Sequence, residues 1–157
     1  MSAQLYALVL AFPFFLYALY EDLRFRAVTP LPLVFLAGIE TALRVAYDRD
    51  AWSLYFFVLL SLVFIVVHKT WPKLLPEGDV YVLIAALSAL WGPWSLYVFL
   101  LALAVVDVLV RAIYAMRLGK KAFTEVPLPL VAEVVPALVI VLAAQVAGLV
   151  AWFASLG

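Results

Sequence analysis

The sequence predicts an all-α fold, a bundle of membrane-spanning helices that forms one domain over residues 1–157. Of the 157 residues, 69% are hydrophobic and only 13% are charged, and the mean hydropathy is +1.19. Soluble domains typically have roughly 45–50% apolar residues, so this composition indicates a polytopic membrane protein. The apolar residues also occur in runs close to the ~20 residues that a helix needs to cross a bilayer.

Prolines, glycines and charged turns divide these runs. Thr29 is expected to cap a second helix that begins at Pro30. A single helix over the 39 residues from Gly78 to Met116 would be ~58 Å long, about twice the hydrocarbon thickness. We therefore expect a break at Gly92–Pro93. The expected spans are 1–20, 30–47, 51–67, 75–91, 94–114 and a last one that runs straight from Ala137, after an irregular entry with three prolines.

The distribution of basic residues supports this count, because cytoplasmic loops carry an excess of Lys and Arg. Six spans with both termini outside place eight basic residues on the cytoplasmic side and two on the other. An unbroken span from 78 to 116 would give four and six instead. The cytoplasmic set is Arg24, Arg26, Lys69, Lys73, Arg111, Arg117, Lys120 and Lys121, and the outer set is Arg44 and Arg49, the latter in the polar turn Asp48–Asp50.

This topology places Asp22 and Asp79 at the cytoplasmic ends of the first and fourth spans. Ionisable groups at the ends of apolar helices are functional candidates. Two carboxyl groups held close together share one proton. The ionised one then takes a proton from water while the protonated one polarises a carbonyl group, as in aspartic proteases. The alternative is structural: Asp22 in a charged loop with Arg24 and Arg26, and Asp79 as a first-turn residue favoured by the helix dipole.

The segments that carry these aspartates resemble the signatures of one family. EDLRFRAVTP, from Glu21 to Pro30, is similar to the first signature of type IV prepilin peptidases, in which an aspartate and basic residues lead into the second span. LPEGDV, from Leu75 to Val80, resembles the second signature, GxGD, which presenilin-type proteases share, although Pro76 replaces its first glycine. Lys120–Lys121 followed by Val126–Pro129 is similar to the family's basic loop and proline-rich entry into the last span.

The resemblance implies a membrane aspartyl endopeptidase of the cell membrane, with Asp22 and Asp79 catalytic at the cytoplasmic face and with no metal or cofactor. Its substrates would be pilin-like or archaellin-like precursors, in which a short basic leader precedes an apolar helix. Since the chain has no cysteine, it is more similar to the archaeal preflagellin peptidases than to bacterial members with a zinc-binding domain, and we expect no methyltransferase activity. Glu77 is a candidate partner for basic leader residues, and Gly78 is expected to allow a close approach of the substrate or a tight turn.

The charged residues also bear on other possible functions. The net charge of zero gives no reason to expect a nucleic-acid partner, and the single histidine, His68, does not suggest a metal site. An alternative function is a small ion- or proton-coupled transporter, with Asp107, Glu133 and Glu40 as the path; a non-catalytic scaffold is a third.

Two local pairs are also expected within the helices, Glu40 with Arg44 and Asp107 with Arg111, each four residues apart. Glu133 is a candidate to line the same cavity as the two aspartates.

Overall fold

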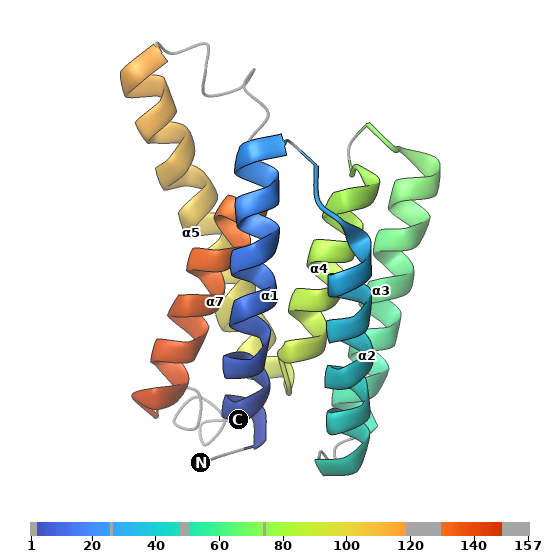
Figure 1. Ribbon diagram of the computed structural model, residues 1–157. Coiled ribbons are helices and arrows are strands. Elements are labelled where there is room, and N and C mark those ends of the chain that lie inside the picture. Colours follow the sequence, from blue (N-terminus) through green and yellow to red (C-terminus); the bar gives the residue numbers. More distant parts are fainter. Residues whose placement is uncertain (1–2, 26, 48–50, 74, 119–129, 149–157) are drawn as a thin grey trace.

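A computed structural model describes residues 3–25, 27–47, 51–73, 75–118 and 130–148 (Figure 1). Helices account for most of these residues and no strand occurs among them, which confirms the all-α class. The predicted features at Arg26, Asp48–Asp50, Lys120–Lys121 and Val126–Pro129 lie outside the described residues. The helices are α1 (Ala3–Phe25), α2 (Pro30–Tyr47), α3 (Ala51–Thr70), α4 (Glu77–Ala89), α5 (Pro93–Leu118) and α7 (Leu130–Val146).

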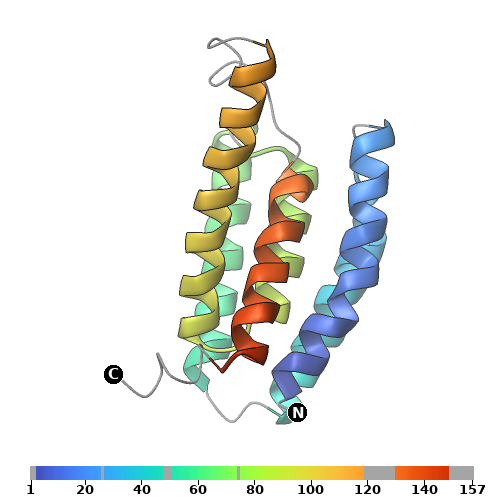
Figure 2. The same cartoon turned by 90° about the vertical axis from the view of Figure 1, so that its left-hand side faces the viewer.

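Successive helices run in alternating directions, so each end of the bundle collects alternate helix termini. The ends of α1, α3 and α5 and the beginnings of α2, α4 and α7 lie at the upper end in Figure 1. We call this the Asp22 end, and the opposite one, where α4 leads into α5, the Gly92 end. Helix α4 is central and packs against α1, α2, α3 and α7, whereas α5 packs mainly on α7 (Figure 2).

Three of the described helices are long and apolar enough to cross a membrane: Gln4–Phe25, Pro30–Tyr47 and Pro93–Arg117. Shorter apolar stretches occur at Leu54–Thr70 and Leu130–Val146. Helix α4 has only 13 residues and a length of ~20 Å, which is less than the ~30 Å of bilayer hydrocarbon. Six spans with outside termini therefore remain a prediction.

The pattern of burial distinguishes α4 from the helices around it. Large apolar side chains are exposed on every described helix except α4. Outward-facing apolar side chains on the peripheral helices suit contact with lipid, whereas α4 forms the interior of the bundle. The buried core draws on α1, α2, α4, α5 and α7, with Phe15, Leu36, Val82, Phe99 and Leu138 among its largest members.

The last helix begins earlier than expected. Helix α7 starts at Leu130 and continues through Pro136, so the expectation of an irregular chain is wrong from Leu130 to Pro136, while its part at Val126–Pro129 lies outside the described residues. Pro136 itself is exposed, while its neighbours Val135 and Ala137 are buried. Burial of both neighbours offsets the ~3 kcal/mol or more that a proline costs inside a helix. Proline is also tolerated more readily in membrane helices than in soluble ones.

The break between α4 and α5 is confirmed. Helix α4 ends at Ala89 and α5 begins at Pro93. Gly92 between them has a φ of +82°, which lies in the left-handed region that glycine enters without a steric penalty.

Replacing Gly92 with alanine should therefore destabilise the protein by ~1–2 kcal/mol, since a Cβ disfavours this backbone conformation. The measurement is the unfolding temperature in detergent. Gly38→Ala is the matched control. Gly38 lies within α2, and an added Cβ there meets no atom within 4 Å, so the same substitution should be neutral or slightly stabilising. Equal effects of the two substitutions would contradict the assignment.

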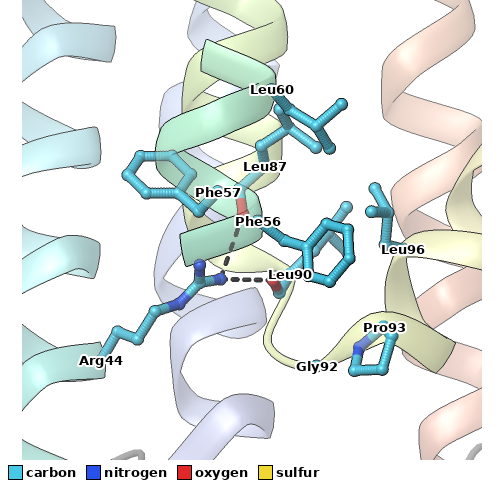
Figure 3. Close-up of a pocket in the computed structure, with 9 residues that line it drawn as sticks. All are labelled: Arg44, Phe56, Phe57, Leu60, Leu87, Leu90, Gly92, Pro93 and Leu96. Atoms are coloured by element: carbon cyan, nitrogen blue, oxygen red, sulfur yellow. Dashed lines mark hydrogen bonds between the residues drawn. The ribbon is translucent and has the colours of Figure 1, made fainter. Parts of the chain in front are cut away.

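At the Gly92 end, Arg44 of α2 caps α4. Its guanidinium Nη2 donates to the carbonyl oxygens of Leu87 (3.2 Å), Ser88 (3.1 Å) and Leu90, and Figure 3 shows it reaching the turn. The expectation that Glu40 and Arg44 satisfy each other within α2 is wrong. Both carboxylate oxygens of Glu40 are buried without a hydrogen-bond partner, because Arg44 is directed to the backbone of α4 instead.

Candidate active site

Asp22 lies on the last turn of α1. This helix continues to Phe25, past the expected end of the first span at Tyr20, so the Asp22 side chain projects from a helix and not from a loop. It is half-buried. Asp22 therefore has a backbone position fixed by the packing of α1 against α2, α4 and α7.

The preceding residue, Glu21, fixes the connection between α1 and α2. Its buried carboxylate accepts hydrogen bonds from the backbone N–H of Thr29 (2.8 Å) and from the Thr29 hydroxyl (2.7 Å). Helix α2 begins at Pro30 as predicted, but the Thr29 hydroxyl is donated to Glu21. Sequence reasoning missed this role, because the partners are eight positions apart on either side of the end of α1, where no single-helix spacing rule applies.

Asp79 lies on the first turn of α4 and is also half-buried. Pro76 is the N-cap, and its carbonyl oxygen accepts the backbone N–H groups of Asp79 (3.1 Å) and Val80 (3.2 Å). The φ of Pro76 is −57°, within the range to which the proline ring restricts the backbone. The position therefore does not need glycine, and the departure from GxGD is compatible with the local geometry.

The two signature-like segments meet at the Asp22 end. A Cβ built on Gly78 would lie 4.0 Å from the Cβ of Val28, so the link between α1 and α2 packs against the first turn of α4. The negative charge of Asp22 also acts on the Asp79 carboxyl group. Helix α1 diverges from α4 and α7 toward this end in Figure 2. The two carboxyl groups are therefore within electrostatic range on helices that are not closely packed at this end.

The other two predicted site residues flank Asp79. Gly78 lies inside the first turn of α4, so the expected tight turn is wrong, and an added Cβ would make only an ordinary contact. Glu77 is exposed, and its Oε1 accepts a hydrogen bond from the Tyr81 hydroxyl (3.1 Å) one turn later. Glu77 thus presents a carboxylate to the surface beside Asp79.

Two further acidic residues adjoin this region. Asp107 on α5 pairs with Arg111, with 2.7 Å between Oδ1 and Nε, as expected. Glu133 on α7 is only 7% exposed. The charges of Asp107, Arg111 and Asp79 act on it. Helices α1, α4, α5 and α7 therefore bring Asp22, Asp79, Glu133 and Asp107 into one electrostatically connected group.

Glu40 does not join this group. It is fully buried on α2, and the charge that acts on it is that of Arg44. The three acids of the transporter hypothesis are thus divided, with the charge of Asp107 acting on Glu133 and Glu40 lying nearer the Gly92 end.

The basic residues Arg24 and His68 near the Asp22 end both contact groups of the protein itself. Arg24 is exposed and donates to the hydroxyl of Tyr20, with its guanidinium over the rings of Tyr20 and Phe25. The Nδ1 of His68 lies 2.9 Å from the carbonyl oxygen of Leu75. Among the described residues, no group of three or more His, Cys, Asp or Glu side chains is arranged to hold a metal ion.

The chemistry available at the Asp22 end is therefore that of carboxyl groups: proton transfer, activation of water and attraction of cationic groups. No family model, curated protein or solved structure matches this chain.

Proposed function

We propose that this protein is a membrane aspartyl endopeptidase that uses Asp22 and Asp79 to cleave a leader peptide from pilin-like or archaellin-like precursors. The observation that carries the proposal is the placement of these two half-buried carboxyl groups at one end of the bundle, on the last turn of α1 and the first turn of α4. The packing of Val28 against the first turn of α4 supports it independently, because that contact joins the two segments that resemble the family's signatures.

The proposed reaction needs only one proton on the pair. The ionised carboxylate takes a proton from water as the water oxygen attacks the carbonyl carbon of the scissile peptide. The protonated carboxyl gives its proton to the carbonyl oxygen. The tetrahedral intermediate then collapses and its C–N bond breaks: the carboxyl group that took the proton from water gives it to the departing amine, and the hydroxyl formed from the carbonyl oxygen returns its proton to the other carboxylate as the new carboxyl product forms. Both carboxyl groups return to their starting protonation states, so no metal or covalent intermediate is required.

The proposed site lies at the cytoplasmic boundary of the cell membrane. The substrate's apolar helix would lie in the bilayer beside the peripheral helices, whose large apolar side chains face outward. Its leader would then reach the beginning of α4 from the aqueous side. The eight-to-two distribution of basic residues supports this orientation.

Glu77 is proposed to attract the basic residues of the leader. Replacing it with glutamine should raise the KM for a precursor with a basic leader by roughly 2–5-fold, as expected for an exposed ion pair, with kcat nearly unchanged. Steady-state cleavage in detergent micelles measures both constants. A precursor whose leader lysines and arginines are replaced by glutamine is the control, since wild type and Glu77→Gln should process it equally. An unchanged KM for the basic leader would exclude this role.

The test of the proposed function is direct processing of a precursor. Purified protein would be mixed with a precursor that carries a basic leader and an apolar helix, and the products identified by mass spectrometry. We expect cleavage between leader and helix that is lost in both Asp22→Asn and Asp79→Asn. Absence of cleavage by the wild type across several pilin-like precursors, or full activity of either variant, would refute the proposal.

A second candidate function is proton or cation transport through Asp107, Glu133 and Glu40. The observation that favours it is Glu40, a buried carboxyl group whose oxygens have no hydrogen-bond partner, since such groups often mark ion paths in membrane proteins. Ion flux into proteoliposomes that is lost in Glu40→Gln, together with no cleavage of precursors, would favour transport.

A further inference from the structure

The last turn of α1, which carries Asp22, is held by a polar side chain and not by apolar packing. The buried apolar side chains of α1 end at Ala18, and beyond it Glu21 is the only buried residue of the helix. In the last turn itself, Leu23 and Phe25 are exposed. Helix α1 also diverges from α4 and α7 toward this end (Figure 2). The position of Asp22 relative to α4 therefore depends on what Glu21 holds.

The partner of Glu21 is Thr29, the residue directly before α2. Glu21 is 8% exposed, and each of its carboxylate oxygens accepts one hydrogen bond from Thr29. The backbone N–H of Thr29 donates to Oε2 (2.8 Å), and the hydroxyl donates to Oε1 (2.7 Å). Two hydrogen bonds between the same two residues fix orientation as well as distance, as in other bidentate contacts. The link between α1 and α2 is thereby closed into a loop of fixed geometry.

The same link also contacts α4. Val28, the neighbour of Thr29, packs against the core, and a Cβ built on Gly78 would lie 4.0 Å from the Cβ of Val28. Glu21 directly precedes one of the two proposed catalytic aspartates, and Gly78 directly precedes the other. Two contacts, Glu21 with Thr29 and Val28 with Gly78, therefore join the residues next to the two aspartates. We call this pair of contacts the Glu21 brace.

We propose that Glu21 is a positioning residue: through this brace it sets where Asp22 lies relative to Asp79. The inference rests on the proposed peptidase function, in which both carboxyl groups must be aligned with one water molecule and one carbonyl group. A misplacement of about 1 Å costs up to ~10²-fold in rate. The role needs the hydrogen bonds of Glu21 and not its charge, which distinguishes it from an electrostatic effect on the neighbouring Asp22.

The first test separates the hydrogen bonds of Glu21 from its charge. Glu21→Ala removes both, and kcat for a precursor with a basic leader and an apolar helix should fall by roughly 10–100-fold with KM nearly unchanged. Glu21→Gln should recover most of the lost kcat. Its amide oxygen still accepts the backbone N–H of Thr29, and its amide N–H is able to donate to the Thr29 hydroxyl oxygen.

Two results of this test would overturn the proposal. If the charge of Glu21 mattered and not the brace, Glu21→Gln would be as slow as Glu21→Ala. If the role were purely structural, Glu21→Ala would lower the unfolding temperature but leave kcat of the folded fraction unchanged. Each variant is therefore assayed below its own unfolding temperature.

The partner side of the brace gives a second comparison. Thr29→Val removes the hydroxyl but keeps the backbone N–H, so kcat should fall by less than in Glu21→Ala. Combining it with Glu21→Gln leaves a buried amide N–H without its acceptor, so the double variant should be slower than the product of the two single effects. A purely multiplicative result would contradict the brace. Thr41→Val is the matched control, because its hydroxyl donates to the carbonyl oxygen of Ala37 within α2, and its kcat should equal that of the wild type.

A third test does not depend on cleavage. Because the chain has no cysteine, Leu23→Cys with Glu77→Cys accepts spin labels only at these two exposed positions, on the last turn of α1 and the first turn of α4. Pulsed electron paramagnetic resonance should give a narrow distance distribution that Glu21→Ala broadens and that Glu21→Gln and Thr41→Val preserve. An unchanged distribution in Glu21→Ala would overturn the brace whatever the cleavage assay gives. Failure of the wild type to cleave any precursor would instead overturn the peptidase function.

Discussion

Asp22→Asn and Asp79→Asn should each lower the rate of precursor cleavage by about 10³-fold, within the ~10²–10⁴-fold range of single acid–base groups. Asparagine preserves the shape of the side chain but neither accepts a proton from water nor donates a carboxyl proton. The two groups act as one unit in the proposed reaction, so the double variant should be scarcely slower than either single variant. The measurement is the initial cleavage rate of a purified precursor in detergent.

Measuring the unfolding temperature of each variant distinguishes a loss of catalysis from a loss of folded protein. The charge of Asp22 acts unfavourably on the Asp79 carboxyl group, so replacing either one removes a repulsion between like groups. The unfolding temperature of Asp79→Asn should equal or exceed that of the wild type, and that of Asp22→Asn is measured beside it. Glu40→Gln provides the control for cleavage, because it removes a buried acid outside the acidic group and should leave the rate within a few-fold. A variant that is stable and retains more than a tenth of wild-type activity would exclude that aspartate from the reaction.

The boundaries predicted correctly are those set by local backbone chemistry. Pro30 begins α2, and Gly92–Pro93 separates α4 from α5, since the proline ring and a positive φ constrain the chain whatever surrounds it. The pairing of Asp107 with Arg111 was predicted for an equally local reason, because the two residues lie one helical turn apart. The placement of Asp22 and Asp79 near the ends of two helices at one end of the bundle also followed from sequence, through the alternation of apolar segments.

The features that sequence reasoning missed depend on contacts between distant segments. Pro136 predicted a late start for α7, but burial of its neighbours against other helices keeps the helix intact. The spacing of Glu40 and Arg44 predicted a pair within one helix. Arg44 is directed instead to Leu87 and Leu90 on α4, because the end of a buried helix presents carbonyl oxygens that have no other donor. No spacing rule applied to one helix identifies such a partner.

Arg44 is expected to contribute more to stability than any other basic side chain of the described helices. It is 2% exposed and donates to three carbonyl oxygens where α4 ends inside the bundle. Irregular backbone at membrane depth is tolerated only where protein groups satisfy it. The Nε2 of Gln4 donates a hydrogen bond to the next carbonyl oxygen, that of Trp91, at 2.8 Å. These two side chains supply donors to the carbonyl oxygens at the end of the 13-residue helix α4.

Arg44→Met should therefore destabilise the protein by ~3–5 kcal/mol, since it leaves buried acceptors without donors and Glu40 without the positive charge beside it. The unfolding temperature in detergent should fall by about 10 °C. Arg24→Met is the matched control: Arg24 is exposed and contacts only aromatic residues of its own helix among the interactions described above, so its loss should have little effect on stability.

A double variant measures how much of the stability lost in Arg44→Met is due to the buried Glu40. Adding Glu40→Leu to Arg44→Met removes the isolated buried acid, so the double variant should recover part of the lost stability. The unsatisfied carbonyl oxygens of Leu87, Ser88 and Leu90 remain, so recovery should be incomplete. Since α4 carries Asp79 at its other end, loosening its anchored end should also reduce precursor cleavage in Arg44→Met below the unfolding temperature. Equal unfolding temperatures for Arg44→Met and Arg24→Met would show that α4 does not depend on this cap.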